Sequence, residues 1–359
     1  MNWKKRRSRL LAKSWGRILL RSLSWAYGFG AMSRGLLYDL GLLRARAVAA
    51  RVVCIGNLTA GGTGKTPAAV LAAMTLRSKG VSTAILSRGY GRPQKGREIS
   101  VLVDESASSW KQCGDEPWMM HQLLKGQGVP ILVSPDRIRA GTQAVNFYHS
   151  RVLILDDGFQ HRALKRDLDI VLIDAAAPFG GRHFLPYGDL REAPYALRRA
   201  HLVVLTHSDL ISPADLSALR EEIRRLHAKV PVLESVHAPD FLFDAKTDAR
   251  LPLEHLQGLG VVTLAAIAVP EQFEAMIERL GARVAQKWQY PDHHRYTLDE
   301  LSALSRLAGE APLVTTFKDI VRFPDGWRDL LSREVYVLAV KLEIVKGREI
   351  WDAALGRLA

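Results

Sequence analysis

One short stretch, from Gly56 to Pro67, constrains the fold of this chain more than any other. It reads GNLTAGGTGKTP, follows an apolar run at 51–55 and precedes a helical pattern. A glycine-rich loop between a strand and a helix turns its backbone N–H groups toward phosphate oxygens, and the positive end of the helix adds to the attraction. The stretch therefore predicts a nucleotide-binding α/β domain.

The loop departs from the usual G-x-x-x-x-G-K-[ST] pattern, because Thr59 stands where the first glycine is expected. The end of the pattern, Gly64-Lys65-Thr66, is standard. In such loops the lysine reaches the β- and γ-phosphates and the hydroxyl that follows it ligates Mg²⁺. The alternative is a glycine-rich turn that binds nothing, which a Lys-Thr pair at this junction disfavours. The predicted nucleotide-binding residues are Thr59, Ala60, Gly61, Gly62, Thr63, Gly64, Lys65 and Thr66.

Helical and apolar strand patterns alternate after the loop, which is typical of a doubly wound parallel sheet. We expect helices over 67–79 and 114–124 and from 134, and strands over 81–86, 99–103, 129–133, 152–155, 170–173 and 202–205. The pattern changes near 231–239, and 241–259 is mixed and loop-rich, so we expect a domain boundary there. A second, smaller α/β unit follows, with strands at 261–267, near 313 and at 335–342, and helices at 271–280, from 298 and from 348. The predicted parts are 1–50, 51–235 and 236–359.

The N-terminal fifty residues carry most of the positive charge. Residues 1–51 hold twelve Lys or Arg and one Asp, which gives +11 of the net +13 of the chain. Apolar residues recur there at helical spacing from Leu10 to Leu43, with Trp15, Trp25 and Tyr27 among them. A basic, aromatic-rich amphipathic helix favours a membrane surface over nucleic acid. The alternative is a helix docked on its own domain.

This segment is too short in apolar sequence to cross a bilayer. Its longest uncharged window, Ser22 to Ser33, falls below the roughly twenty apolar residues that a spanning helix needs. The two cysteines of the chain are too few for a disulfide framework, which favours a reducing compartment.

Several carboxylates follow predicted strands. Asp156 and Asp157 end the apolar run 152–155, where P-loop enzymes place the carboxylate that holds Mg²⁺. The second of the pair is a candidate base or a turn residue. Asp115 and Glu116 open a predicted helix, where an aspartate caps as readily as it catalyses. His293 and His294 lack the Cys or Glu spacing of a zinc site.

A regulatory GTPase is the alternative function from another class. The sequence from Leu202 to Asp209 is similar to the guanine-reading strand and loop of such switches. The likeness fails at His207, where a lysine is expected. An assay that compares bound ATP with bound GTP discriminates between the two.

Taken together, the ordered motifs are GNLTAGGTGKTP, SRGYGR, GDEP, SPDR, DDGFQH, LPYGDLRE, AAIAVPEQF, YPDHHRY and TFKD. This series resembles the tetraacyldisaccharide 4′-kinases, the lipid A 4′-kinases of Gram-negative bacteria, over nearly the whole chain. The resemblance implies a P-loop NTPase-like fold. It also implies transfer of the ATP γ-phosphoryl group to a sugar hydroxyl of an acylated glucosamine disaccharide at the cytoplasmic face of the inner membrane.

The resemblance implies roles for particular residues, with ATP and Mg²⁺ as cofactors and no obligate protein partner. The catalytic set is Lys65, Asp115, Asp157 and His293, with Asp115 ahead of Asp157 as the base, and the metal ligands are Thr66, Glu116 and Asp156. The substrate contacts are Asn57, Arg88, Arg137, Gln160, His161, Arg191 and Glu192. The protein is expected to be peripheral or monotopic on the membrane.

Two departures from the family pattern stand out. Tyr187 and Asp189 occupy positions where the family commonly has a small residue and a proline, which bears on substrate contacts. Phe317 replaces the more usual Glu before Lys318, which bears on a contact between domains.

Overall fold

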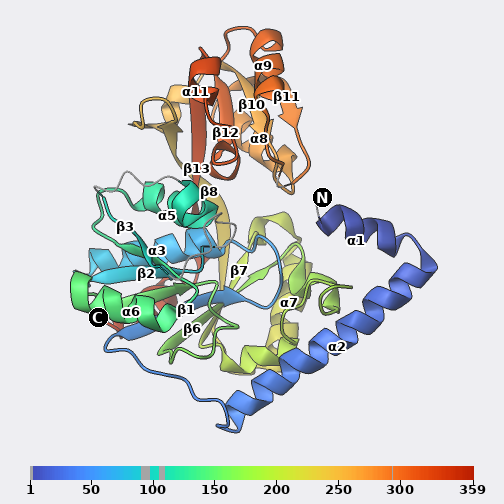
Figure 1. The fold of residues 1–359 in the computed structure, drawn as a ribbon, viewed down its shortest axis with the longest axis vertical. Helices are drawn as coiled ribbons and strands as arrows, with labels where there is room; N and C mark the ends of the chain where they lie inside the picture. The colour runs from blue at the N-terminus through green and yellow to red at the C-terminus, as the bar shows by residue number, and fades with distance from the viewer. Residues whose placement is uncertain (1–2, 90–97, 105–109, 293) are drawn as a thin grey trace.

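A single mixed β-sheet runs through the whole computed structural model, which describes residues 3–89, 98–104, 110–292 and 294–359 (Figure 1). The strand order is β11-β10-β12-β13-β8-β7-β6-β1-β5-β2-β4-β3, and β9 pairs with β8. The strands are β1 Arg51–Asn57, β2 Thr83–Ser87, β3 Ser100–Leu102, β4 Ile131–Val133, β5 Val152–Asp156, β6 Leu168–Asp174, β7 Leu202–Thr206, β8 Val232–Asp244, β9 Arg250–Leu251, β10 Gly260–Ala265, β11 Arg283–Gln289, β12 Leu313–Thr316 and β13 Val335–Lys346.

The helices cover both faces of this sheet. The α-helices are α1 Trp3–Leu11, α2 Ser14–Asp39, α3 Lys65–Ser78, α4 Trp110–Cys113, α5 Asp115–Leu124, α6 Arg137–Tyr148, α7 Pro213–Leu226, α8 Pro270–Arg279, α9 Leu298–Leu307, α10 Phe317–Ile320, α11 Trp327–Leu330 and α12 Arg348–Gly356. Short 3₁₀ turns lie at Pro178–Arg182, Pro194–Arg199, Ser208–Leu210 and Leu253–Leu256.

Strand β1 shows why the centre of the sheet is so apolar. Val53 and Ile55 join a buried cluster that includes the alanines of α3, whereas Val52 and Cys54 join a second cluster with the alanines of α6. Successive side chains of a strand point to opposite faces, so both faces are covered here. The pairings from β4 through β2, β5, β1, β6, β7 and β8 are all parallel. The predicted doubly wound, mainly parallel fold is confirmed.

Two long antiparallel strands, β8 and β13, carry the sheet into a second, smaller part built on β10, β11 and β12 (Figure 1). Strand β8, Val232–Asp244, runs through the expected change of pattern near 231–239 and into the stretch 241–259 that was expected to be loop-rich. Pro239 is tolerated where the register with β13 shifts, between Ala339 and Val340. The expected boundary between 235 and 236 falls inside this strand. Strand β11 was also missed, since most of its residues are exposed and polar.

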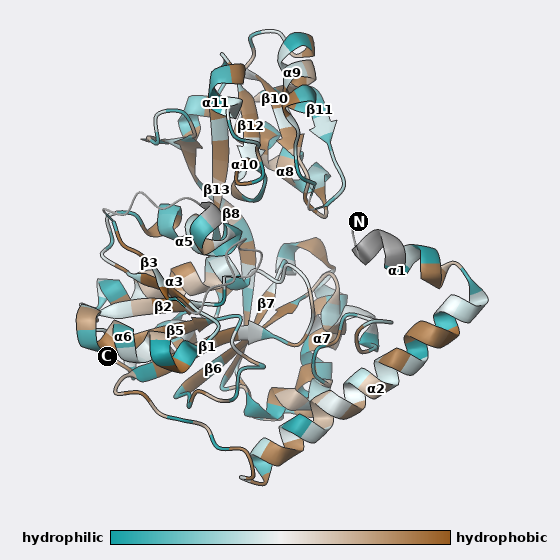
Figure 2. Cartoon of the chain, in the orientation of Figure 1, coloured by the Kyte–Doolittle hydropathy of each residue, from teal (hydrophilic) through white to brown (hydrophobic). Residues whose placement is uncertain are grey.

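The N-terminal segment forms two helices rather than one, because Lys13 is extended and interrupts the helical pattern. Helix α2 runs along one side of the first part (Figure 1). Its buried residues lie four apart and are mostly small, namely Gly16, Leu20, Ser24 and Gly28. Its large apolar residues point outward instead, and brown patches line the helix in Figure 2. The exposed ones include Trp15, Ile18, Leu23, Trp25, Phe29 and Leu36.

Candidate active site

The phosphate loop connects β1 to α3 and is braced from within. Gly64 has a φ of +78° and Gly61 a φ of +130°, values that favour glycine at both positions. The Asn57 amide donates to Thr63 Oγ1 at 2.8 Å, and Lys65 Nζ donates to the Gly61 carbonyl at 3.2 Å. Hydrogen bonds within the loop therefore fix its conformation.

The carboxyl end of β5 faces this loop. Asp157 Oδ1 lies 3.7 Å from Lys65 Nζ, and Arg191 Nη1 donates to both oxygens of Asp157 at 2.9 Å. Burial raises the pKa of Asp157, but the positive charges of Lys65 and Arg191 outweigh it, so the pKa lies below its ordinary value. The structure thus brings together Lys65, Asp157 and Arg191, three of the predicted site residues.

Asp156 is fully enclosed beside this group. Its Oδ2 accepts from the Ser87 hydroxyl at 3.3 Å, while its Oδ1 is buried without a hydrogen-bond partner. Burial first, and then the charges of Glu116 and Asp157, raise the pKa of Asp156 to about 7. An unpartnered buried oxygen in a cluster of acids has the chemistry of a cation ligand.

Glu116 stands across from Asp156 at the start of α5. Part of its side chain is accessible to solvent. Many protein atoms still lie around the carboxyl group, and the resulting desolvation is the main cause of the raised pKa of Glu116. Within the part of the chain that the structure describes, no three His, Cys, Asp or Glu side chains could hold a metal by themselves. That fits Mg²⁺, which commonly uses one or two carboxylates and completes its shell with phosphates and water.

A group of basic residues lies next to the carboxylates. Arg137 is buried, donates to the Ser134 carbonyl at 3.1 Å, and has its pKa lowered to about 10 by burial. His161 Nε2 is buried without a partner, and the pKa of His161 is lowered to about 4, first by burial and then by Arg137, Arg34, Arg166 and Arg88. Several cations around a neutral histidine make a site that favours an anion.

The remaining predicted substrate residues make contacts within the protein. Gln160 Nε2 donates to the Asn57 carbonyl at 2.8 Å, and Glu192 Oε2 accepts from Arg199 at 2.8 Å. Asn57 and Gln160 therefore brace the phosphate loop. Asp115 is the first residue of α5, and His293 lies outside the described residues.

Sequence reasoning missed a group of residues beneath the loop. The Thr206 hydroxyl donates to the Thr63 carbonyl at 3.3 Å, and the His237 ring stacks on His207 with centroids 4.4 Å apart. His237 lies against Gly64, because a Cβ at that glycine would stand 3.0 Å from the ring. Only the polar sequence after β7, Thr206-His207-Ser208-Asp209, signalled part of this group.

Asp189 and Phe317, which depart from the family pattern, each contact another part of the chain. The Asp189 carbonyl accepts from the Ala60 amide at 2.7 Å, and its carboxylate pairs with Arg7 of α1. Phe317 packs against Trp118 of α5, with ring centroids 6.2 Å apart. An apolar contact therefore stands between α10 and α5 in this chain.

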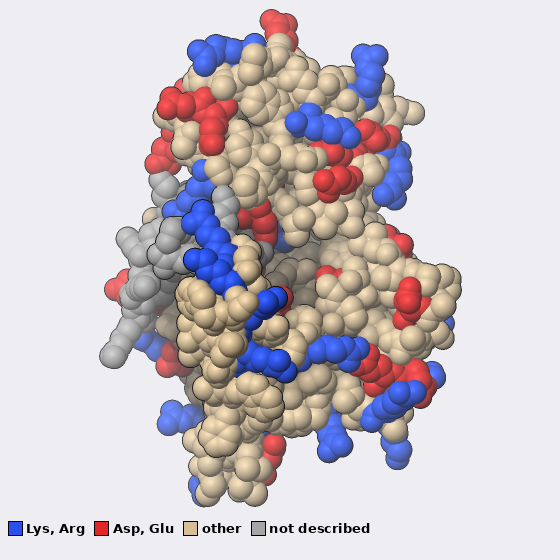
Figure 3. All heavy atoms as spheres, turned by 90° about the vertical axis from the view of Figure 1, so that its right-hand side faces the viewer, with Lys and Arg blue, Asp and Glu red and all other residues tan. Residues whose placement is uncertain are grey.

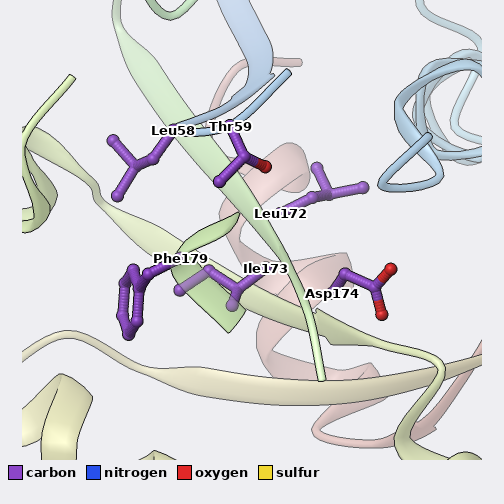
Figure 4. A pocket seen from close by; sticks show the side chains of 6 residues that line it. All are labelled: Leu58, Thr59, Leu172, Ile173, Asp174 and Phe179. Atoms are coloured by element: carbon purple, nitrogen blue, oxygen red, sulfur yellow. The ribbon is translucent and has the colours of Figure 1, made fainter. Parts of the chain in front are cut away.

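A small pocket opens beside the start of the loop, lined by Leu58, Thr59, Leu172, Ile173, Asp174 and Phe179 (Figure 4). It includes neither Lys65 nor Asp156, so it is separate from the phosphate-facing group. Figure 3 shows a larger hollow between the two parts of the molecule, with acidic atoms inside it and basic side chains along its lower border.

Comparison with known proteins places this geometry in a family. Residues 16–358 match the model of LpxK, tetraacyldisaccharide-1-P 4′-kinase. The chain belongs to this kinase family. A tetraacyldisaccharide 4′-kinase of Elusimicrobium minutum (strain Pei191) is 46% identical over 98% of this chain and 94% of its own length. Another from Anaeromyxobacter dehalogenans (strain 2CP-C) is 44% identical over 90% of this chain and 86% of its own.

A solved structure agrees with the sequence comparisons. LpxK from Aquifex aeolicus, crystallised in complex with ATP, superposes with a TM-score of 0.76 at 29% identity, over 95% of this chain and 99% of that one. The fold and the kinase family are therefore established together.

Proposed function

We propose that this kinase transfers the γ-phosphoryl group of ATP to the 4′-hydroxyl of a tetraacylated glucosamine disaccharide 1-phosphate. The observation that carries the proposal is the meeting of Lys65, Asp156 and Asp157 at the mouth of a braced phosphate loop. Phosphoryl transfer depends almost wholly on positioning and on neutralising charge, and these residues supply both.

Asp156, Glu116 and the Thr66 hydroxyl fit a Mg²⁺ ion. The unpartnered Asp156 oxygen and the raised pKa values of both acids support this assignment. When bound, the ion neutralises charge on the transferring phosphate. Lys65 Nζ lies 3.2 Å from the Gly61 carbonyl and 3.7 Å from Asp157 Oδ1, so its ammonium group is placed to reach the phosphates that the loop would hold.

We assign the proton-accepting role to Asp115 rather than Asp157. Asp157 is held by two bonds from Arg191, and the lowered pKa of its carboxyl makes it a weak base. Asp115 begins α5 next to Glu116 and carries a carboxylate outside the proposed metal ligands. His293 is proposed to assist it.

Arg88, Arg137 and His161 are proposed to bind anionic groups of the disaccharide, since their surroundings favour an anion. Arg191, Gln160, Asn57 and Glu192 are proposed to shape the site around them. Arg34 of α2 donates to the Gln160 carbonyl at 3.0 Å, so the N-terminal helix reaches the same border.

Helix α2 is proposed to hold the protein on the cytoplasmic face of the inner membrane, as a peripheral or monotopic protein. Its outward face is apolar and aromatic, with Trp25 at 74% and Phe29 at 71% exposure. Such a face costs free energy in water and gains it in the headgroup region. Among the described helices, none has the length and apolar content to cross a bilayer.

Each of the three predicted parts of the chain has its own role in this proposal. We propose that 1–50 bind the membrane, that 51–235 form the kinase domain, and that 236–359 close over the active site. Strands β8 and β13 join the last two.

The test is transfer of labelled γ-phosphate to a purified tetraacyldisaccharide 1-phosphate, with ATP and GTP compared. We expect Mg²⁺-dependent transfer from ATP, and a loss of at least about a hundredfold in kcat for Asp156→Ala. Asp352→Ala on α12 is the matched carboxylate control. Undiminished turnover by Asp156→Ala would contradict the assignment, and transfer from GTP in preference to ATP would contradict ATP as the donor.

A further inference from the structure

Hydrogen bonds hold the turn at 316–319, which follows β12, in a fixed conformation, and we call this turn the platform. Asp319 is buried, and its carboxylate accepts from the Ala266 amide at 3.1 Å, the Tyr296 hydroxyl at 3.2 Å and the Thr316 hydroxyl at 2.7 Å. The Asp319 amide in turn donates to Thr316 Oγ1 at 3.2 Å. These bonds fix the backbone on both sides of Lys318.

The platform also rests on the first part of the molecule. Phe317 is buried between Trp118 of α5 and Phe243 of β8, with ring centroids 6.2 Å and 5.5 Å away. Helix α5 begins with Asp115 and Glu116, so this contact sets the turn beside the acidic side of the active site.

Lys318 points from this platform to the phosphate loop. Its Nζ would stand 3.6 Å from a Cβ placed on Gly62, and its charge acts on Glu116 and His237. The side chain is exposed, and no ion pair of Lys318 is found among the described residues. A lysine fixed at its base and facing a glycine turn differs from the common solvated surface lysine.

The position is complementary to that of Lys65. Lys65 Nζ donates to the carbonyl of Gly61, the residue before Gly62. The ammonium groups of Lys65 and Lys318 therefore approach the same glycine pair from different parts of the chain. In loops of this type the lysine at the Lys65 position serves the β- and γ-phosphates. A second ammonium at the same turn lies within reach of the same phosphates.

We propose that Lys318 is a phosphate-binding residue that contacts the γ-phosphoryl group of ATP and stabilises its charge during transfer. The inference rests on the proposed placement of the triphosphate at the loop. Cations that neutralise the transferring group in other P-loop enzymes contribute large factors to kcat. An ammonium acts here as a point charge, without the fork of an arginine.

The test compares Lys318→Gln and Lys318→Arg with Lys246→Gln, which removes one positive charge from the turn between β8 and β9. We expect Lys318→Gln to lower kcat about ten- to a hundredfold, with a smaller change in KM for ATP. Lys318→Arg should recover most of kcat, which a merely structural role would not require. Lys246→Gln should match the wild type, and all variants should unfold at the wild-type temperature.

A binding measurement decides the question without the lipid acceptor. Isothermal titration with Mg²⁺ and either ADP alone or ADP with aluminium fluoride separates contacts to the γ position from the rest. Lys318→Gln should bind ADP about as well as wild type and lose about tenfold or more in affinity for the aluminium fluoride complex. Equal loss for both ligands, or none for either, overturns the inference. Absence of transfer by the wild type would instead count against the proposed acceptor, because this titration does not use it.

Discussion

The phosphate-loop region and helix α2 use apolar residues in opposite ways. Around the loop, apolar strands are buried on both faces, and polar groups gather where those strands end. In α2 the buried residues are small apart from Leu20, and most of the large apolar residues face solvent. The first arrangement is complete within one chain, whereas the second leaves large apolar side chains exposed.

Amphipathicity therefore identifies a helix but does not tell which of its faces packs on the protein. Gly28 approaches the Phe184 ring, Ser24 donates to the Phe184 carbonyl at 2.7 Å, and Tyr27 packs beside the same ring. Docking by small residues leaves Trp25 and Phe29 exposed, on the face that we propose to contact lipid.

The largest expected effect is the loss of kcat on substitution of Lys65 in the phosphate loop. Lys65→Ala should lower kcat by at least about a hundredfold, because the loss removes charge stabilisation of the transferring phosphate. Binding to anionic vesicles should stay unchanged. Lys79→Ala, at the other end of α3, is the control. A Lys65→Ala enzyme with normal turnover would break the contrast on the side of the loop.

The next effect belongs to the outward face of α2. The double change Trp25→Glu and Phe29→Glu should weaken sedimentation with anionic vesicles by about tenfold or more, since two large apolar side chains are lost from the bilayer surface. KM for the lipid acceptor should rise while KM for ATP stays constant. Phe147→Glu is the matched control, because Phe147 is 73% exposed on α6. If Phe147→Glu weakens vesicle binding equally, α2 has no special part in it.

Adding one methyl group to the face of α2 that packs on the protein should lower the stability of the fold. A Cβ on Gly28 would lie 2.5 Å from the Phe184 ring, whereas one on Gly30 meets nothing within 4 Å. Both variants gain the same helix propensity, so Gly28→Ala should be less stable than Gly30→Ala by about 1–3 kcal/mol from overpacking. Urea unfolding measures the difference. Equal stabilities would mean that the docked face is loosely packed.

The smallest effect at neutral pH concerns His237. Its pKa is lowered to about 3, first by burial and then by His207 and Lys318, with Asp174 opposing. Between pH 6.5 and pH 3 the unfolded chain binds a proton at this residue and the folded chain does not, so stability falls as the pH falls. His237→Gln should flatten that fall and change little at pH 7.

Urea titrations at pH 7, 6 and 5 measure this slope. His149→Asn is the control, because His149 is exposed and asparagine tolerates its φ of +50°. A His237→Gln protein that loses stability in acid as steeply as wild type would place the sensitivity elsewhere.

Much of the fold and part of the site could be predicted because the signals are local. The loop, the strand that ends at Asp156 and the helix that begins at Asp115 each follow from a short run of residues. Strand β8 could not be predicted, since Pro231 and Pro239 signal loops and Pro239 is accommodated only at a register shift in the pairing with β13. His237 and Lys318 approach the loop through long-range contacts that no spacing in the sequence encodes.

The length of α2 bears on how such an enzyme finds its substrate. A helix of 26 residues is about 39 Å long, so a protein held along it would keep one orientation and diffuse laterally. Encounters with a lipid acceptor would then occur in two dimensions. Turnover should follow the mole fraction of acceptor in the membrane rather than its bulk concentration, and dilution with inert lipid at constant acceptor should slow it. Unchanged turnover on such dilution would mean that the acceptor is taken from solution.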